Sequence, residues 1–377
     1  MAAKMRAAVP ALLALLIPFA RAEERWKIQY FYDKPDAVFN IRDMACPSAQ
    51  HCVAVGAIVG LNGRVKGATV TTSDGGQHWT LEDFSEEPVS LFLPSEGKGW
   101  MVTDRGIWTT EEGGRGWKKL GPMKGIVQVY FLDQSHGFAI GYPKAIFETT
   151  DGGLKWDKLA EAQTPASKPE DTIYDCIAFS GQQGVIVGRV MTDKYQRYPV
   201  WLVPNAERVR QQKQSEVFLL QTLDGGKTWK SSTESIVGDI TELRFMHDAD
   251  ALALIEYHDV YQLPSSVLKL KLGAPGSRMI FGERDRAVSD VALLPDGGAL
   301  IASVEPPGNT NQVPIPGKLK ILRSKNLRLW EEMEVDYRAD AQRATIAAPD
   351  AQHAWVATDT GMILGLEQKN AAKPAGD

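Results

Sequence analysis

The stretch Thr72-Ser73-Asp74-Gly75-Gly76-Gln77-His78-Trp79 decides the fold, because it recurs along the chain with the same internal spacing. Two further intact copies read TTDGGLKW at 149–156 and TLDGGKTW at 222–229. A degenerate copy carries Glu112 at the aspartate position, and a worn copy without the glycines ends at Trp330. A unit repeated in this way predicts a repeat architecture rather than a chain of unrelated elements.

Each residue type in the repeat suits a tight turn that leads into a strand. The aspartate carboxylate accepts backbone N–H groups, the glycines allow positive φ, and the threonine adds a second local hydrogen bond. The tryptophan opens the next strand and supplies apolar surface for packing between neighbouring sheets. Because the turn occupies the carboxylate oxygens, we interpret the motif residues as structural rather than catalytic: Asp74, Trp79, Glu112, Trp117, Asp151, Trp156, Asp224 and Trp229.

A second pattern fixes the number of repeats. Seven windows each begin with a polar residue, continue with an apolar residue, and carry an apolar residue after a turn-rich middle. They begin at Asp43, Ser90, Gln128, Asp175, Glu242, Asp290 and Thr345. Strand–turn–strand units of this length are typical of β-hairpins. The sequence therefore predicts an all-β, seven-bladed β-propeller of four-stranded antiparallel blades.

The last unit has no tryptophan motif after Ile363, so its outer strand must come from elsewhere. Trp26-Lys27-Ile28 resembles the strand start Trp117-Lys118-Lys119 that follows the degenerate motif. We therefore expect the N-terminal strand to complete the seventh blade and close the ring, which leaves only short, protected edges. The propeller is expected to span 23–367, followed by a flexible tail at 368–377.

The first 22 residues resemble a secretory signal peptide. Lys4 and Arg6 precede an apolar run from Ala7 to Ala20, and small residues flank a cleavage position near Ala22. The run is short for a bilayer span, although a retained anchor or a buried strand stays an open alternative. We expect a periplasmic or secreted protein with no membrane span in the mature chain.

The three cysteines divide into a pair and a single residue. Cys46 and Cys52 are close enough to close a tight loop between antiparallel strands, and export permits a disulfide. A zinc site is a poor alternative, because only His51 stands nearby and a structural site needs four ligands. Cys176 lies among apolar residues and is expected to be a buried thiol. We expect neither a metal nor any other cofactor.

Composition and motifs exclude several function classes. The formal net charge of -5, with acidic and basic residues interspersed, gives no reason to expect a nucleic acid partner. The sequence contains no phosphate-binding loop, nucleophile elbow or dinucleotide fingerprint.

The repeats resemble the Asp-boxes of the BNR-repeat superfamily, which includes sialidases, other glycoside hydrolases and non-catalytic propellers. Gly137-Phe138-Ala139-Ile140-Gly141, followed by Thr150 to Trp156, resembles the photosystem II stability and assembly factor family. The resemblance extends over essentially the whole mature chain. Family members with a known role are non-enzymatic assembly proteins, so the resemblance implies a binding function.

The polar residues that open the seven windows are expected to surround one mouth of the central channel. Four of them are carboxylates, and three further residues stand beside them in the sequence; the candidate site is Asp43, Asp175, Glu242, Asp290, Arg42, Tyr174 and Arg244. The ring is either a set of solvated polar residues at strand starts or a mouth that attracts a cation or a polar ligand. Sequence alone leaves both interpretations open.

The same face is expected to carry the longest insertions, at 189–217, 256–266 and 303–318. The insertion at 189–217 combines three aromatic residues with a short basic helix, a composition typical of protein contact patches. Packing of these loops onto the propeller is the alternative. We expect a protein partner to bind the face that carries 189–217, and we expect the protein to be a monomer.

Enzymatic activity is the competing hypothesis. A sialidase would carry Phe-Arg-Ile-Pro where this chain reads Phe39-Asn40-Ile41-Arg42, so sialidase activity is not expected. A glycoside hydrolase of neutral polysaccharides needs two carboxylates about 5–10 Å apart, for which the channel-mouth acids are candidates. We therefore predict an exported, non-catalytic protein-binding or assembly scaffold, with a glycoside hydrolase as the alternative.

Overall fold

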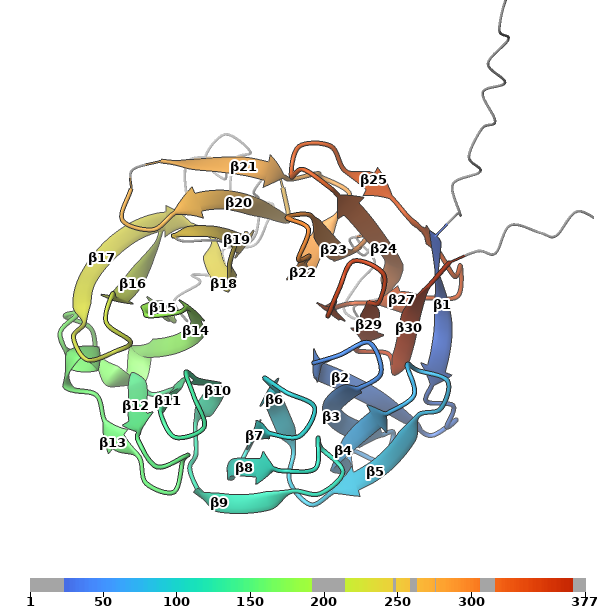
Figure 1. Cartoon of the computed structure of the whole chain (residues 1–377), viewed down its shortest axis with the longest axis horizontal. Helices are drawn as coiled ribbons and strands as arrows, with labels where there is room; N and C mark the ends of the chain where they lie inside the picture. The colour runs from blue at the N-terminus through green and yellow to red at the C-terminus, as the bar shows by residue number, and fades with distance from the viewer. Residues whose placement is uncertain are drawn as a thin grey trace, which may run out of the picture.

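The computed structural model describes residues 24–191, 214–246, 249–257, 263–274, 276–305 and 316–368. These residues form a closed ring of seven antiparallel blades around a central channel, which confirms the predicted propeller (Figure 1). The described residues contain two short 3-10 helices, η1 (Ala160–Gln163) and η2 (Pro169–Asp171). No helix among them is long and apolar enough to cross a membrane.

The first three blades each contain four strands that run in chain order from the channel to the rim. Blade 1 consists of β2 (Ala37–Ala45), β3 (Cys52–Gly60), β4 (Val65–Thr72) and β5 (Thr80–Phe84). Blade 2 consists of β6 (Pro88–Phe92), β7 (Gly99–Thr103), β8 (Gly106–Thr110) and β9 (Lys118–Pro122). Blade 3 consists of β10 (Ile126–Phe131), β11 (Gly137–Gly141), β12 (Ala145–Thr149) and β13 (Asp157–Lys158).

The next three blades follow the same order. Blade 4 consists of β14 (Thr172–Ser180), β15 (Gln183–Val190), β16 (Gln214–Thr222) and β17 (Lys230–Val237). Blade 5 consists of β18 (Asp239–Phe245), β19 (Asp250–Glu256), β20 (Ser265–Lys271) and β21 (Ser277–Phe281). Blade 6 consists of β22 (Ala287–Leu293), β23 (Ala299–Val304), β24 (Gly317–Ser324) and β25 (Glu331–Glu332).

The N-terminal strand closes the ring as predicted. Blade 7 consists of β28 (Ala344–Ala347), β29 (Trp355–Thr358), β30 (Met362–Gln368) and β1 (Glu24–Phe31). Strand β1 runs antiparallel to β30 with Trp26 opposite Leu366, and Trp26 is almost fully buried. The connection from blade 6 adds two short strands that sequence reasoning did not foresee: β26 (Glu334–Val335) pairs with β1, and β27 (Asp340–Ala341) pairs with β24.

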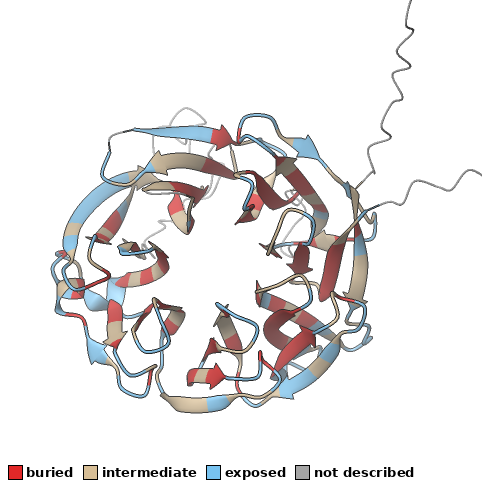
Figure 2. Ribbon diagram, viewed as in Figure 1, coloured by how far each residue is buried: buried red, intermediate tan, exposed pale blue. Residues whose placement is uncertain are grey.

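The core lies between neighbouring blades, where buried side chains of adjacent sheets meet. Figure 2 shows burial concentrated on the inner and middle strands, with exposed residues on the outer strands. Trp100 of blade 2 stacks on Phe131 of blade 3 with ring centroids 3.7 Å apart. Middle strands such as β3, with sequence CVAVGAIVG, read as continuous apolar runs because both of their faces are covered over most of their length.

The Asp-box turns have the hydrogen bonds that their residue types predicted. Thr72 Oγ1 accepts the N–H of Gly76 at 3.0 Å, and Asp74 Oδ1 accepts the N–H of His78 at 2.9 Å. The boxes at Asp151 and Asp224 repeat both bonds. These contacts lower the pKa of Asp74 and Asp224 to about 2, which marks them as ionised structural acceptors.

The degenerate and worn boxes keep only part of this arrangement. Thr110 Oγ1 still accepts the N–H of Gly114 at 3.0 Å, whereas the Glu112 carboxylate makes no hydrogen bond to the turn's backbone among the described residues. In the worn box Asn326 Oδ1 accepts the N–H groups of Arg328 and Leu329. Leu327 takes a left-handed backbone there, with φ of 56°, although it has a side chain.

The cysteines behave as predicted. Cys46 and Cys52 form a disulfide across the turn between β2 and β3, and Cys176 is a free, buried thiol. Burial raises the pKa of the Cys176 thiol far above its usual range, so it is not a reactive nucleophile.

Candidate functional site

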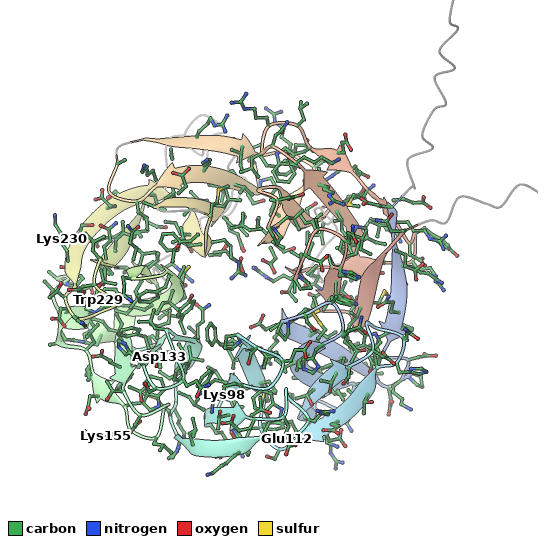
Figure 3. The ribbon with its side chains drawn as sticks, viewed as in Figure 1. Lys98, Glu112, Asp133, Lys155, Trp229 and Lys230 are labelled. Carbon is green, nitrogen blue, oxygen red and sulfur yellow. A yellow bond between two sulfur atoms is a disulfide. The ribbon has the colours of Figure 1, made fainter. Side chains whose placement is uncertain are left out.

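The two faces of the ring carry different structures. Asp-box turns and inner hairpin turns lie on one face, where Figure 3 labels Glu112 and Lys155 near the rim and Asp133 closer to the channel. On the other face, the loops between second and third strands bond to the starts of the inner strands. The N–H of Asp104 donates to the carbonyl of Glu87, and the N–H of Asp359 to that of Arg343. We call this second side the channel-mouth face.

The predicted ring residues lie on the seven inner strands, but inside the strands rather than at their first residues. Asp43, for example, lies near the C-terminal end of β2. A β-bulge lies beside the polar position in six of the seven inner strands. A bulge adds an unpaired residue and changes the direction of the neighbouring side chains. The bulges could not be recognised from the aligned sequence windows.

The structure also corrects the alignment in blade 4. Asp43 pairs with Val55, and the equivalent pair in blade 4 is Cys176 with Val187. The hairpin of blade 4 is one residue shorter than those of the other blades, so the ungapped window selected Asp175 in place of Cys176. Asp175 is instead the bulged residue beside the ring position.

Two of the four predicted carboxylates join neighbouring blades. Asp43 accepts the N–H of Met44 at 2.8 Å through Oδ1 and the N–H of Leu91, on blade 2, at 2.7 Å through Oδ2. Asp290 accepts the N–H of Val291 at 2.6 Å and, through its other oxygen, the N–H of Ile346 on blade 7 at 2.8 Å. Each of these carboxylate oxygens therefore accepts a backbone N–H group of the framework.

Other ring positions make the same kind of link with neutral side chains. Gln128 Oε1 accepts the N–H of Ile177 at 3.2 Å, between blades 3 and 4. Ser90 Oγ donates to the carbonyl oxygen of Val127 at 2.7 Å, and Thr345 Oγ1 donates to Asp290 Oδ2 at 2.8 Å. Most residues of the polar ring therefore connect neighbouring blades by hydrogen bonds.

Glu242 and Arg244, both on β18, complete a charged cluster with Asp290. The Arg244 guanidinium lies 3.0 Å from Glu242 Oε2 and 3.5 Å from Asp290 Oδ1. Burial raises the pKa of Glu242 well above its usual range, and the Asp290 carboxylate raises it further. Burial also raises the pKa of Asp43 to about 6, although its two backbone hydrogen bonds oppose that shift.

Asp175 belongs to a separate group between blades 4 and 5. Arg189 Nε donates to Asp175 Oδ2 at 2.9 Å, and Arg189 Nη1 lies 3.2 Å from Asp239 Oδ2 on blade 5. Burial raises the pKa of Asp175 to about 6, against the opposing effect of Arg189. The four predicted carboxylates thus fall into two groups rather than one site.

The two remaining candidates have different positions. Arg42 donates to the Pro88 carbonyl at 3.1 Å and to the Glu87 carboxylate at 3.0 Å, which fastens blade 1 to blade 2 on the channel-mouth face. Tyr174 does not reach that face: it is fully buried, and its hydroxyl donates to the Ala162 carbonyl at 2.8 Å. The connection that contains η1 covers Tyr174, an arrangement that no local sequence pattern reveals.

Two surface hollows lie on the Asp-box face rather than in the channel mouth. One, of about 560 Å³, lies between blades 2 and 3 and is lined by residues that include Trp117, Leu120 and Leu154. The other, of about 360 Å³, is lined by residues that include Asp133, His136 and Asp224. Within the described residues no group of histidine, cysteine and acidic side chains has the arrangement of a metal site.

Parts of the predicted insertions lie outside the described residues, namely 192–213, 258–262 and 306–315. The predicted contact residues of the insertion at 189–217 also lie outside the described residues: Tyr195, Tyr198, Trp201, Arg208, Arg210 and Lys213. The same holds for the signal segment 1–22 and the tail after Gln368.

Comparison with known proteins supports the resemblance seen in the sequence. A family model described as Photosynthesis system II assembly factor YCF48 matches residues 119–192. Two relatives, each named Photosystem II assembly lipoprotein Ycf48, are 24% identical over 147 residues (Trichormus variabilis) and 27% identical over 137 residues (Synechococcus sp.). These matches cover 34% and 31% of this chain and 42% and 40% of the relatives, so the chain spans about two fifths of their length.

A solved structure agrees over the whole ring. That of YCF48 bound to D1 peptide superposes with a TM-score of 0.58 at 15% identity, covering 93% of this chain and 97% of that one. At this identity the likeness establishes the fold. The chain is a BNR-type β-propeller, and its resemblance to the photosystem II assembly factor family, first read from the repeat around Asp151, is confirmed.

Proposed function

We propose that this chain is a non-catalytic scaffold that binds a partner protein on its channel-mouth face. One observation carries the proposal: Asp43 and Asp290, two of the acids a catalytic mouth would use, accept backbone N–H groups of neighbouring blades. A carboxylate held in this way links two blades, and the framework fixes its orientation. The family resemblance supports the same conclusion, since the named relatives are assembly proteins.

The glycoside hydrolase alternative requires an acid with a raised pKa facing a second, ionised carboxylate across a cleft. Glu242 has the raised pKa, but its neighbour Asp290 is committed to Ile346 and Thr345. The surface hollows lie on the opposite face. The cluster around Arg244 is therefore better explained as a structural ion pair than as a hydrolytic centre.

The channel-mouth face offers charged groups that a partner protein can use. Arg343 pairs with Glu256 at 2.6 Å, and its guanidinium remains largely exposed, as does that of Arg105. Exposed ion pairs of this kind steer encounter and give specificity at an interface. The related propeller solved with a D1 peptide supports binding of a protein segment by this fold.

We propose further that the chain is exported and acts outside the cytoplasm, in the periplasm or secreted, as a monomer. The signal-like segment before Glu23 supports export, and the relatives' description as lipoproteins is consistent with it.

Site-specific photocrosslinking tests the proposal. A photoreactive residue at Arg105, on the channel-mouth face, should capture a discrete partner protein from an extract of the source organism. The same residue at Lys227, in an Asp-box turn, should capture little. Capture from Lys227 alone would contradict the proposal. Hydrolysis of a glycan by the purified protein, abolished by Asp43→Asn or Asp175→Asn, would instead show that the protein is an enzyme.

A further inference from the structure

We infer that blade 1 carries a docking ledge for a short apolar segment of the partner protein, an inference that rests on the proposed function. The ledge consists of Val38, Val59 and Val65, with Leu61 at its tip. All four side chains are exposed, by 48%, 40%, 46% and 83% respectively. Of the eleven large hydrophobic residues exposed in the described part of the chain, these four lie together on one blade. Apolar residues gathered in this way mark an interaction site, unlike apolar residues scattered singly.

Strand register places the three valines in one row. Val38 on β2 is opposite Val59 on β3, and Val59 is opposite Val65 on β4. Residues directly opposite each other in antiparallel strands project from the same face of the sheet. Neighbouring strands lie about 4.8 Å apart, so the row is roughly 10 Å long. Leu61 extends it, because its N–H bonds to the Asp36 carbonyl at 2.8 Å and holds the hairpin tip beside β2.

The row is exposed because blade 2 does not extend far enough along the strands of blade 1 to cover it. Gly67, two residues after Val65 and on the same face of β4, has the carbonyl oxygen of Glu86 and the ring of Pro88 directly against it. A side chain at Gly67 would clash with that segment, which therefore covers the face at this level. Val65 lies about 7 Å farther along the strand, beyond the cover. The strands of blade 1 are longer than those of blade 2, so its sheet overhangs its neighbour.

The size of the ledge indicates which kind of ligand it can bind. Its exposed apolar area is on the order of 400 Å², the size of a functional patch on a monomer. A stable dimer buries about 800 Å² on each partner, so a second copy of this chain would gain too little from the ledge. A short extended segment suits it better, since alternate side chains lie about 7 Å apart and two or three of them can cover the row.

The surroundings favour a peptide over a lipid surface. The segment that borders the ledge carries the Arg42–Glu87 ion pair, and Arg42 also donates to the Pro88 carbonyl. Charged and hydrogen-bonding groups beside an apolar row can satisfy a peptide backbone, as the polar rim of a protein interface does. The occupant is therefore an extended segment with apolar side chains at alternate positions.

A phage-displayed library of random peptides of about ten residues tests the inference on the full chain. Selected peptides should share apolar residues at alternate positions. In fluorescence anisotropy, Val59→Thr/Val65→Thr should raise their Kd about tenfold or more, because threonine keeps the strand preference but replaces a methyl group by a hydroxyl. Leu223→Thr, at an exposed leucine of an Asp-box turn, is the control and should leave the Kd unchanged.

Several results would overturn the inference. If the selected peptides bind the Val59→Thr/Val65→Thr variant as tightly as wild type, the inference is wrong. It is also wrong if the selected peptides share no alternating apolar motif. Sedimentation that shows a dimer broken by the ledge variant would assign the ledge to a second copy. Loss of binding to phosphatidylcholine vesicles in that variant would assign it to lipid. Crosslinking from Arg105 is independent of these valines, so a partner captured equally by wild type and ledge variant would contradict the ledge and leave the proposed function standing.

Discussion

Asp43 Oδ2 accepts the backbone N–H of Leu91 at 2.7 Å, across the boundary between blades 1 and 2. Its other oxygen accepts the N–H of Met44, so removing the carboxylate leaves two N–H groups without acceptors. We expect Asp43→Ala to lower the free energy of unfolding by about 2–6 kcal/mol, since each of the two orphaned groups costs about 1–3 kcal/mol. Urea unfolding followed by tryptophan fluorescence measures the effect. Glu82→Ala, at an exposed position, is the control and should stay within about 0.5 kcal/mol of wild type.

Glu242 predicts an unusual pH dependence. Its pKa is raised in the folded state, so the folded protein retains a proton that the unfolded chain releases at lower pH. The contribution of this group to stability is complete below the unfolded pKa of about 4.3 and is lost as pH rises through the higher folded value. Glu242→Gln has a fixed neutral group, so its stability relative to wild type should increase as pH rises. Urea midpoints of both proteins between about pH 5 and 8 measure this difference.

The aspartates of the Asp-boxes have the opposite effect on the pH dependence of stability. The pKa of Asp74 and Asp224 is lowered, so their stabilising contribution is present above about pH 4 and is lost as pH falls toward 2.

The Glu242 prediction has a clear opposite outcome. If the stability of Glu242→Gln relative to wild type falls as pH rises, Glu242 is ionised in the folded state. That result would agree with a charged ion pair between Glu242 and Arg244 and would contradict the raised pKa of Glu242.

The sequence determined the fold to an unusual extent, because the Asp-box makes its own turn and needs no distant partner. Its copies predicted a repeat fold, and the seven aligned hairpin windows predicted the number of blades. Trp26 predicted the closing strand, and in the structure it lies opposite Leu366. The strands β26 and β27 were not foreseen, because two-residue pairings leave no periodic pattern in the sequence. Cys176 was missed as a ring residue because an ungapped window does not detect a hairpin shortened by one residue.

The candidate site was harder to predict, because the role of each side chain depends on the neighbouring blade. Asp43 and Asp175 look alike in sequence, yet one binds a backbone N–H of blade 2 and the other an arginine of its own blade. The exposure of Val59 could not be predicted from the sequence either. The run CVAVGAIVG reads as a fully buried strand, and only the shorter strands of blade 2 leave its far end uncovered.

The degenerate box of blade 2 predicts a stabilising substitution. Thr110 keeps its bond to the turn, but the longer Glu112 side chain does not bond to the backbone as Asp74 does in blade 1. Glu112→Asp should restore an acceptor for the N–H of Gly116 and raise the free energy of unfolding by about 0.5–1 kcal/mol. The urea midpoint measures it, with Glu82→Asp as a control for the same change outside a box. An unchanged or lower midpoint would show that the glutamate already serves the turn.

The disulfide between Cys46 and Cys52 closes the turn of the first inner hairpin, and this turn contacts two Asp-boxes. Within that turn, the carbonyl of Gln50 accepts the N–H of Gly75, and the His51 ring bonds to the Gly113 carbonyl at 2.7 Å. Removing the cross-link by Cys46→Ser/Cys52→Ser should lower the free energy of unfolding by about 2 kcal/mol, the value expected for so short a loop.

Thermal unfolding with and without reductant tests this prediction. Reductant should lower the Tm of wild type toward that of the double variant and leave the variant itself unchanged. A matching response in both proteins would assign the effect to something other than this disulfide. An unchanged wild type whose cysteines are shown by mass spectrometry to be reduced would mean that the bonds of Gln50 and His51 hold the turn without the cross-link.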